Sequence, residues 1–581
     1  MTQPPRARPF RPPRLRVKIA EMMDPTRTRR AHRGWWLAAC GAAACMRMAE
    51  PTADATGAEP ESSVGAAVQR SARPVVRRKP PRSAATAASS TSKEPTETTR
   101  PILPPAALTE TYFKHYGINP TIDTAEEPFS SFALDVDTAS YALARAALDR
   151  GEMPDEAAIR VEEFLNAFHY DYPAPTDGDF AVYTEIVPSP HRQGYHVLHV
   201  GLQAREIADK DRAPANLVIV VDVSSSMALE SRLRLVQDAL RSMVARMGAR
   251  DRIAIVTYGT IAAVVLEPTA GDRHATIVEA IDALEPGGST DVDAGLRLGY
   301  SLADRSALIG GINRVLLFSD GVVTSGPQAA DELLAHVAES AARGVTISTL
   351  GVGVDNYDDV LLEQLADRGN GNYVYIDRLA EAERVLVRSL GGTLQVVARD
   401  AKIQLEFDPA VVARYRLLGY ENRGLSTDSF AADSTDAGEV GPGQSVTALY
   451  EIEIRDDLAP LGKVRLRYRQ PHTGLSRTLE TLLALGDTRP LDARGTPTVR
   501  VAVVVAALAE KLRGSYWIRG VSWPDIQRWY AELPDDVTAS AEIAELGALI
   551  DTAAQLDRRN AKPDREFASA PLEFDRMPVL Q

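Results

Sequence analysis

Five consecutive apolar residues, Leu217–Val221 (LVIVV), constrain the fold of this chain more than any other segment. A strand without a polar face has to be covered on both sides, as the strands of parallel sheets are covered by helices. The next segment has an apolar stripe whose residues lie three and four positions apart, which is the spacing of one helix face. The stripe consists of Leu233, Val236, Leu240, Met243 and Met247.

Strand-like and helix-like segments continue to alternate up to about residue 390. Strands are expected at Ile253–Tyr258, Val315–Phe318 and Val345–Leu350, and helices at Ala275–Leu284, Asp291–Leu302, Pro327–Ala342 and Ala380–Leu390. This order predicts an α/β fold with an open, doubly wound, mostly parallel, Rossmann-like sheet over residues 214–395. Sheets of this type bind ligands at the carboxyl ends of their strands.

In three loops of the predicted sheet, polar residues directly follow a strand or precede a helix. Asp222, Ser224 and Ser226 come directly after the first buried strand, Asp320 ends a later strand, and Thr290 precedes a helix. The predicted fold brings these three loops to one edge of the sheet, where two carboxylates and three hydroxyls meet. We expect this oxygen set to bind Mg²⁺, or Mn²⁺ or Ca²⁺ in its place, because hard cations prefer such ligands.

The number of carboxylates indicates the use of this site. Two carboxylates only neutralise a divalent ion, and hydroxyls and water leave the ion short of negative charge. An ion in that state accepts an Asp or Glu side chain of a partner protein as its last ligand. Nucleases and phosphatases instead gather three or four carboxylates around two metal ions. The sequence therefore favours protein binding over catalysis.

The segments DVSSS (222–226), GGST (287–290) and FSDG (318–321) resemble the metal-ion-dependent adhesion site of von Willebrand factor type A (VWA) domains, in that family's order. The resemblance implies that Ser224 and Ser226 bind the ion directly. It implies that Thr290 switches between direct and water-mediated contact, and that Asp222 and Asp320 often act through water.

The flanking sequence is similar to one bacterial group of VWA proteins. The likeness extends over about residues 112–560 and implies that a C-terminal domain of unknown function follows the VWA domain. It is carried by DTAEEPFSSFALDVDTASYALARAAL (123–148), RVEEFLNAF (160–168), LADRGNGNYVYID (365–377) and AKIQLEFDPAVVARYRLLGYENR (401–423).

The regions on either side of residues 214–395 have other patterns. Residues 111–213 predict two helices, at 138–150 and 156–168, and then two strands, at 181–187 and 196–202. Residues 396–490 alternate with period two, and we expect their strands to form one β-sandwich with the strands at 181–202, interrupted by the parallel sheet. Residues 491–581 predict a helical region with a loose tail, its helices at about 499–512, 524–531 and 539–556.

The N-terminal region looks like a targeting segment. In residues 1–49, several arginines precede the apolar run Trp35–Cys45, which is typical of an export signal. Leu37–Cys40 resembles a bacterial lipoprotein box, so Cys40, or else Cys45, is the candidate for lipid attachment. Residues 50–110 are rich in Ala, Pro, Ser and Thr and predict a disordered linker. We therefore expect a protein of the cell envelope, as a periplasmic protein or outer-membrane lipoprotein, or a secreted one.

Charge and cysteine content exclude several classes of protein. Residues 1–100 hold 19 Lys and Arg against 8 Asp and Glu, a balance of +11. Because the whole chain has a net charge of −14, residues 101–581 carry −25. An acidic body of this kind argues against nucleic acid as the partner. Both cysteines precede residue 50, which excludes thiolate metal sites from the folded part. No run of about 18 apolar residues predicts a membrane-spanning helix.

Three other motifs have simpler explanations. Asp135-Val136-Asp137-Thr138 looks like the paired aspartates of a phosphotransferase loop, but we expect Asp137 or Thr138 to cap the following helix. Gly351-Val352-Gly353 lacks the third glycine of a dinucleotide-binding loop and predicts a turn. Asp291 and Asp293 either add charge near the ion or belong to a helix cap with Thr290 at the N-cap, and we favour the cap.

Three functions remain open at this point. The favoured one is a non-enzymatic binding module that holds a partner's Asp or Glu through the metal. The second is an assembly scaffold in which the metal is only structural. The third is a metal-dependent hydrolase, for which Asp291 and Asp293 are the candidate acid–base residues.

Overall fold

The computed structural model describes residues 113–134, 136–321, 327–353, 359–388, 395–455, 460–471, 473–483 and 495–559. The predicted leader with Cys40 and Cys45, the linker, Asp135 and the tail after residue 559 lie outside these residues. In the described part of the chain, no helix is long and apolar enough to cross a membrane.

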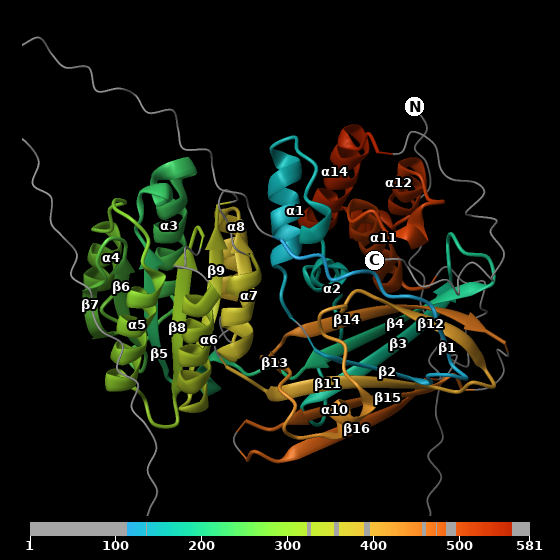
Figure 1. Cartoon of the computed structure of the whole chain (residues 1–581), viewed down its shortest axis with the longest axis horizontal. Helices are drawn as coiled ribbons and strands as arrows, with labels where there is room; N and C mark the ends of the chain where they lie inside the picture. Colours follow the sequence, from blue (N-terminus) through green and yellow to red (C-terminus); the bar gives the residue numbers. More distant parts are fainter. Residues whose placement is uncertain are drawn as a thin grey trace, which may run out of the picture. The chain divides into compact units, whose positions relative to one another are not determined.

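Six strands in the described residues form the predicted parallel sheet, in the order β10-β9-β8-β5-β6-β7. Neighbouring strands are parallel except for β7, an edge strand that is antiparallel to β6. We call residues 215–388 the parallel-sheet domain (Figure 1). Its strands are β5 (Ala215–Asp222), β6 (Arg252–Tyr258), β7 (Ala263–Ala270), β8 (Ile312–Ser319), β9 (Val345–Val352) and β10 (Tyr373–Ile376).

The continuous apolar run in β5 is explained by helices on both faces of this sheet. Leu217, Ile219 and Val221 point into one core, and Val218 and Val220 into the other. The first core is closed by α3 (Arg232–Val244), α4 (His274–Asp282) and α8 (Leu379–Glu383), with η4 (Arg384–Arg388) after it. The second is closed by α5 (Val292–Ser306), α6 (Pro327–Ala342) and α7 (Asp359–Arg368). The doubly wound α/β prediction is confirmed.

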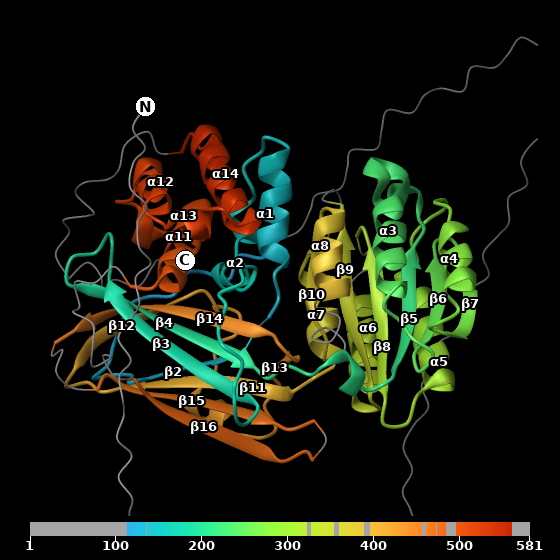
Figure 2. The same ribbon diagram turned by 180° about the vertical axis from the view of Figure 1, so that it is seen from behind.

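Two antiparallel sheets, built from strands that precede and follow the parallel-sheet domain in the sequence, form the predicted β-sandwich. One has the order β1-β12-β14-β4-β3, and the other has the order β13-β11-β15-β16 with β2 also paired to β11 (Figure 2). The bounds before the parallel-sheet domain are β1 (Ile122–Asp123), β2 (Phe129–Ala133), β3 (Phe180–Pro188) and β4 (Tyr195–Ala204). After it they are β11 (Ala398–Phe407), β12 (Val412–Leu418), β13 (Gly438–Val440), β14 (Ser445–Ile454), β15 (Gly462–Arg469) and β16 (Ser476–Leu483), with the short α10 at Thr427–Ala431.

Strands from both sides of the parallel-sheet domain share this sandwich. β4 pairs with β14 from Gln203 opposite Ser445 to Tyr195 opposite Glu453, and one hydrophobic core fills the space between the sheets. The prediction of one interrupted sandwich is therefore confirmed. The parallel-sheet domain is inserted between β4 and β11, which belong to different sheets of the sandwich.

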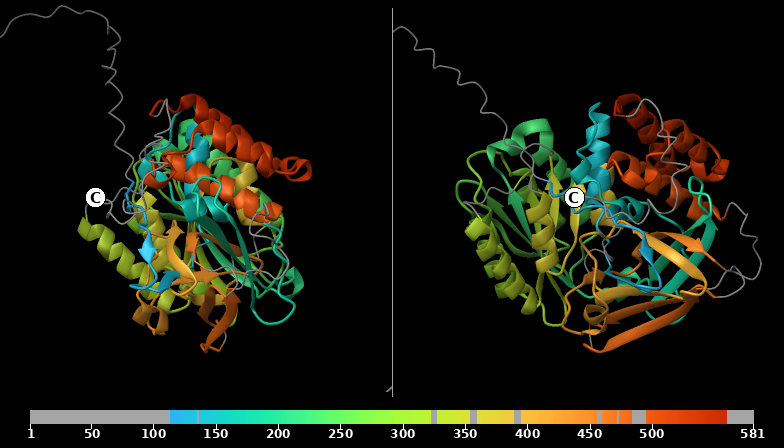
Figure 3. Two further views of the ribbon diagram at one scale, coloured as in Figure 1. Left: turned by 90° about the vertical axis from the view of Figure 1, so that its right-hand side faces the viewer. Right: turned by 45° about the vertical axis from the view of Figure 1, so that its right-hand side comes forward.

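Helices from both ends of the described chain cover the sandwich sheet that contains β4. The C-terminal helices are α11 (Pro497–Leu512), α12 (Trp523–Ala531), α13 (Asp535–Thr538) and α14 (Ala541–Leu556), with η5 at Tyr516–Ile518. They share one core with α1 (Ala139–Asp149) and α2 (Val161–Asn166), seen as red and cyan helices in Figure 3. The helix predicted at 156–168 is divided into η1 (Glu156–Ala158) and α2.

Helix α1 has two buried faces that belong to different cores. Tyr141, Ala144 and Leu148 pack with the C-terminal helices. Ala139, Ala142 and Leu143 pack into the second core of the parallel-sheet domain, beside β10. The β10 edge of the parallel sheet is therefore covered by α1, a helix that ends about 65 residues before the first strand of that sheet.

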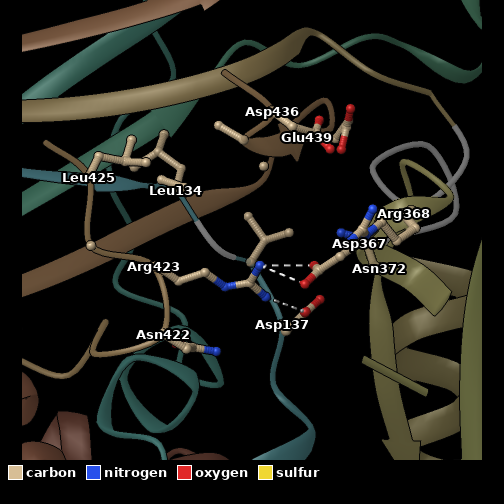
Figure 4. Close-up of a pocket in the computed structure, with 16 residues that line it drawn as sticks. Leu134, Asp137, Asp367, Arg368, Asn372, Asn422, Arg423, Leu425, Asp436 and Glu439 are labelled. Carbon is tan, nitrogen blue, oxygen red and sulfur yellow. Dashed lines mark hydrogen bonds and ion pairs between the residues drawn. The ribbon is translucent and has the colours of Figure 1, made fainter. Parts of the chain in front are cut away.

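Ion pairs join the parallel-sheet domain to the sandwich next to this helix. Arg423 donates to both carboxylate oxygens of Asp367 at 2.9 Å and lies 3.6 Å from Asp137 (Figure 4). Asp137 also accepts a bond from the backbone N–H of Tyr373 in β10, at 2.9 Å. The N-cap of α1 is Thr138, one of the two predicted residues, although its side chain makes no cap bond. Asp137 connects β10 with Arg423.

Candidate metal site

Four of the five predicted site residues form one chain of hydrogen bonds at the carboxyl edge of the sheet. Asp222 ends β5, and its Oδ1 accepts from the backbone N–H of Ser224 at 2.7 Å. The hydroxyls of Ser224 and Ser226 lie 2.9 Å apart, and Ser226 Oγ donates to Asp320 Oδ1 at 3.0 Å. Asp320 directly follows β8, the neighbour of β5, so parallel pairing brings both carboxylates to one edge.

The loop that carries Thr290 is held against the same edge by hydrogen bonds from Ser225. The N–H and the hydroxyl of Ser225 both donate to the carbonyl oxygen of Gly288, at 3.1 and 3.0 Å. Gly288 has a φ of +94°, and a Cβ at this position would lie 2.4 Å from Thr260 Oγ1, so glycine is required. Thr290 follows two residues later and is half-buried.

The acidic residues after Thr290 serve the helix, but not in the predicted way. The N-cap of α5 is Asp291, which accepts from the N–H of Ala294 at 3.0 Å. Thr290 is therefore not the N-cap, and Asp293 is not at the third helical position. Asp293 instead forms an exposed ion pair with Arg297 at 2.8 Å. The helix starts one residue later than the motif suggested, because a carboxylate at Asp291 caps it.

Burial changes the acid–base behaviour of both carboxyls. Asp222 is fully buried, which raises its pKa from 3.8 to about 7; the charge of Asp320 adds to this, and the bonds from Ser224 oppose it. Burial also raises the pKa of Asp320, although Ser226 and Arg232 lower it. Both groups are therefore costly to ionise until a cation approaches.

Arg232 is a member of the site that the motifs did not indicate. It is the first residue of α3, is 3% exposed, and its Nη1 donates to Asp320 Oδ2 at 3.1 Å. Gly353 leaves room for it, since a Cβ there would lie 2.2 Å from Arg232 Nε. A sequence signal existed, because a positive charge in the first turn of a helix is unfavourable unless an acid compensates it.

The donors present fit a hard divalent cation. In the described part of the chain, no group of three or more His, Cys, Asp or Glu side chains is placed to hold a metal. The candidate set has two carboxylates, and its other oxygen atoms come from the hydroxyls of Ser224, Ser226 and Thr290. Asp222 Oδ2 is buried and has no hydrogen-bond partner within the described residues. The Tyr258 hydroxyl lies near this carboxyl and lowers its pKa, but it does not satisfy Oδ2, and a cation would do so.

Family models match three parts of the chain. Residues 217–322 match the model described as von Willebrand factor type A domain, and residues 107–199 match one described as von Willebrand factor. Residues 392–461 match the model described as Uncharacterized protein YfbK, C-terminal.

Two curated proteins and one solved structure are similar to parts of this chain. The chain is 36% identical over 445 residues to the uncharacterized protein YfbK of Escherichia coli, which covers 72% of this chain and 76% of that protein. It is 27% identical over 307 residues to the uncharacterized protein sll0103 of Synechocystis, covering 51% of this chain and 71% of that protein. A solved von Willebrand factor type A structure from Catenulispora acidiphila has 17% identity and a TM-score of 0.39, covering 69% of this chain and 96% of that one.

Proposed function

Because the chain belongs to the family of VWA-domain proteins that includes YfbK, we propose that it is a binding protein that holds a partner's carboxylate through a divalent metal ion. The metal-binding residues of this proposal are Asp222, Ser224, Ser226, Thr290 and Asp320. VWA domains generally mediate protein–protein interactions, which is the part of the proposal that the family itself supports. The observation that carries the metal is the buried Oδ2 of Asp222, which has no hydrogen-bond partner among the residues that the structure describes.

The electrostatic argument for a carboxylate partner rests on Arg232. Asp222 and Asp320 carry two negative charges, and the guanidinium at 3.1 Å from Asp320 cancels one of them. A bound divalent ion then leaves the site with a net charge of about +1 at low dielectric, where such a charge interacts strongly. The ion would supply this positive charge and an open ligand position for an Asp or Glu of the partner. The site is thus more attractive to an acid than the sequence suggested.

A hydrolase at this edge has less support. The two acids considered for catalysis have other roles, since Asp291 caps α5 and Asp293 pairs with Arg297. Neither stands ready to accept a proton from a metal-bound water. We therefore propose a non-enzymatic role. We also propose export to the cell envelope, with lipid attached at Cys40 or Cys45, on the basis of the N-terminal sequence pattern.

Calorimetric titration of Mg²⁺ and Mn²⁺ into the full chain tests the site. We expect saturable binding in the wild type and in Asp293→Ala, and no binding in Asp222→Ala. Asp293→Ala is the matched control because it removes a nearby carboxylate that lies outside the proposed ligand set. An identical titration of wild type and Asp222→Ala would refute the site. If Asp222→Ala abolished metal binding but partner binding persisted, the scaffold alternative would replace the proposal.

A further inference from the structure

Two large apolar side chains are exposed on the loops around the candidate metal site. Leu229 is 47% exposed and Ile261 is 78% exposed. Leu229 belongs to η3 (Ser225–Ser231), which directly follows Asp222–Ser224, and Ile261 lies in the turn between β6 and β7. We call this pair the apolar rim.

Hydrogen bonds connect the two halves of the apolar rim to the Thr290 loop. Ser225, four residues before Leu229, donates twice to the carbonyl of Gly288. Thr260, next to Ile261, accepts a bond from the N–H of Ser289 at 3.1 Å. Both rim residues therefore come from loops that contact the segment leading into Thr290, at the edge where Asp222 and Asp320 lie.

The backbone leaves Leu229 exposed and brings Arg232 to Asp320. Leu229 is extended, with φ −70° and ψ 143°, and Glu230 and Ser231 follow with φ of +49° and +60°. This reversal lets one short loop present an exposed leucine and a buried arginine three residues later. The same loop thus contributes an apolar contact surface and the charge that leaves a loaded site positive.

We infer that the apolar rim is part of the binding surface and selects a partner protein whose Asp or Glu is flanked by large apolar side chains. This inference rests on the proposed function, since it assumes that the acid is captured at the metal. A carboxylate satisfies the net positive charge of the loaded site. Apolar neighbours of that carboxylate cover Leu229 and Ile261, and the removal of this surface from water is favourable. Small anions such as phosphate use only the charge, whereas a peptide segment uses both features.

A displayed peptide library tests the inference with a defined probe. The library has the form Gly-X-X-Z-X-X-Gly, with X randomised and Z either Glu or Gln, and is selected on the immobilised full chain in Mg²⁺. Four proteins are compared: wild type, the double variant Leu229→Ser/Ile261→Ser, Asp222→Ala and Ile309→Ser. Ile309 is the matched control because it is fully exposed but precedes β8, at the opposite edge of the sheet from the site. Thermal unfolding of each variant verifies that it is folded.

The expected selection has two separable parts. Wild type and Ile309→Ser should enrich peptides with Leu, Ile, Phe or Met beside the Glu, and the rim variant should bind these peptides roughly tenfold more weakly, about 1.4 kcal/mol. The rim variant should still prefer Glu over Gln, and Asp222→Ala should select neither feature. Selection of Glu without a preference for apolar neighbours would overturn the apolar rim and leave the metal proposal standing. Wild-type selection indifferent to Glu, or unchanged by Asp222→Ala, would overturn the proposed function itself.

Discussion

Replacement of Asp222 by Asn isolates the cost of a buried charge at the site. Asn has nearly the same shape, and its Oδ1 can still accept from the N–H of Ser224, but it cannot ionise. The pKa of Asp222 is about 7 in the folded protein against an ordinary value of 3.8. This difference corresponds to about 4 kcal/mol of free energy at a pH above both values.

The sign follows from which state holds the proton. Between pH 3.8 and about 7 the folded protein keeps a proton on Asp222 that the unfolded chain releases, so the metal-free wild type loses stability as the pH rises through this window. The stability of the Asn variant does not fall in this way, because Asn has no proton to release. Its amide leaves a buried donor in place of Oδ2, which costs roughly 1–3 kcal/mol at every pH. We therefore expect the variant to be less stable than wild type near pH 4 and more stable at pH 8.

Thermal unfolding in EDTA between pH 4 and pH 8 measures this crossover. The melting temperature of wild type minus that of Asp222→Asn should fall by roughly 10 °C between pH 4 and pH 8, because this is the shift that about 4 kcal/mol produces in a domain of this size. Added Mg²⁺ should raise the melting temperature of the wild type only, and more strongly at pH 8, where no proton has to be displaced. Melting temperatures that run parallel for the two proteins over the whole range would refute the buried-charge argument.

Three other changes test neighbouring parts of the structure. Arg232→Met leaves Asp320 buried without its guanidinium and should cost roughly 3–5 kcal/mol in urea unfolding, while Mg²⁺ binding tightens and acidic peptides bind more weakly; unchanged peptide binding would contradict the charge argument. Gly353→Ala should lower stability more than Gly344→Ala does, since both positions have positive φ but only the Cβ added at 353 would clash with Arg232. Equal losses would show that this clash is unimportant. Residues 214–395 alone, without α1, should exchange the amide hydrogens of β10 much faster than the full chain does, and equal protection would show that α1 is dispensable.

The parallel-sheet core was predictable because its strands are apolar at every position. Such a run has one main structural solution, and β5 follows it. β7 was missed because it is a half-exposed edge strand that contains a proline, and β10 because four residues give too little pattern. The two-sided role of α1 was not predictable, since an alanine-rich helix with two apolar faces does not indicate which cores receive them.

The candidate site was predictable where the residues themselves carry the chemistry. Asp222, Ser224, Ser226 and Asp320 could be placed together because parallel neighbours end at the same edge. The ion pair between Arg232 and Asp320 could not be predicted, because the position of Arg232 in the sequence does not indicate which carboxylate it contacts. The position of the α5 cap differed by one residue, since Thr290 and Asp291 are both good caps and only the backbone decides between them.

The insertion of the parallel-sheet domain between β4 and β11 has a mechanical consequence. A domain on a single linker can swivel, and a pull on it is carried by one peptide segment. This domain is attached by two segments, one to each sheet of the sandwich, and α1 packs against its edge as a third support. Tension applied at the carboxyl edge of the sheet is therefore divided between both sheets, and the orientation of that edge is retained under load.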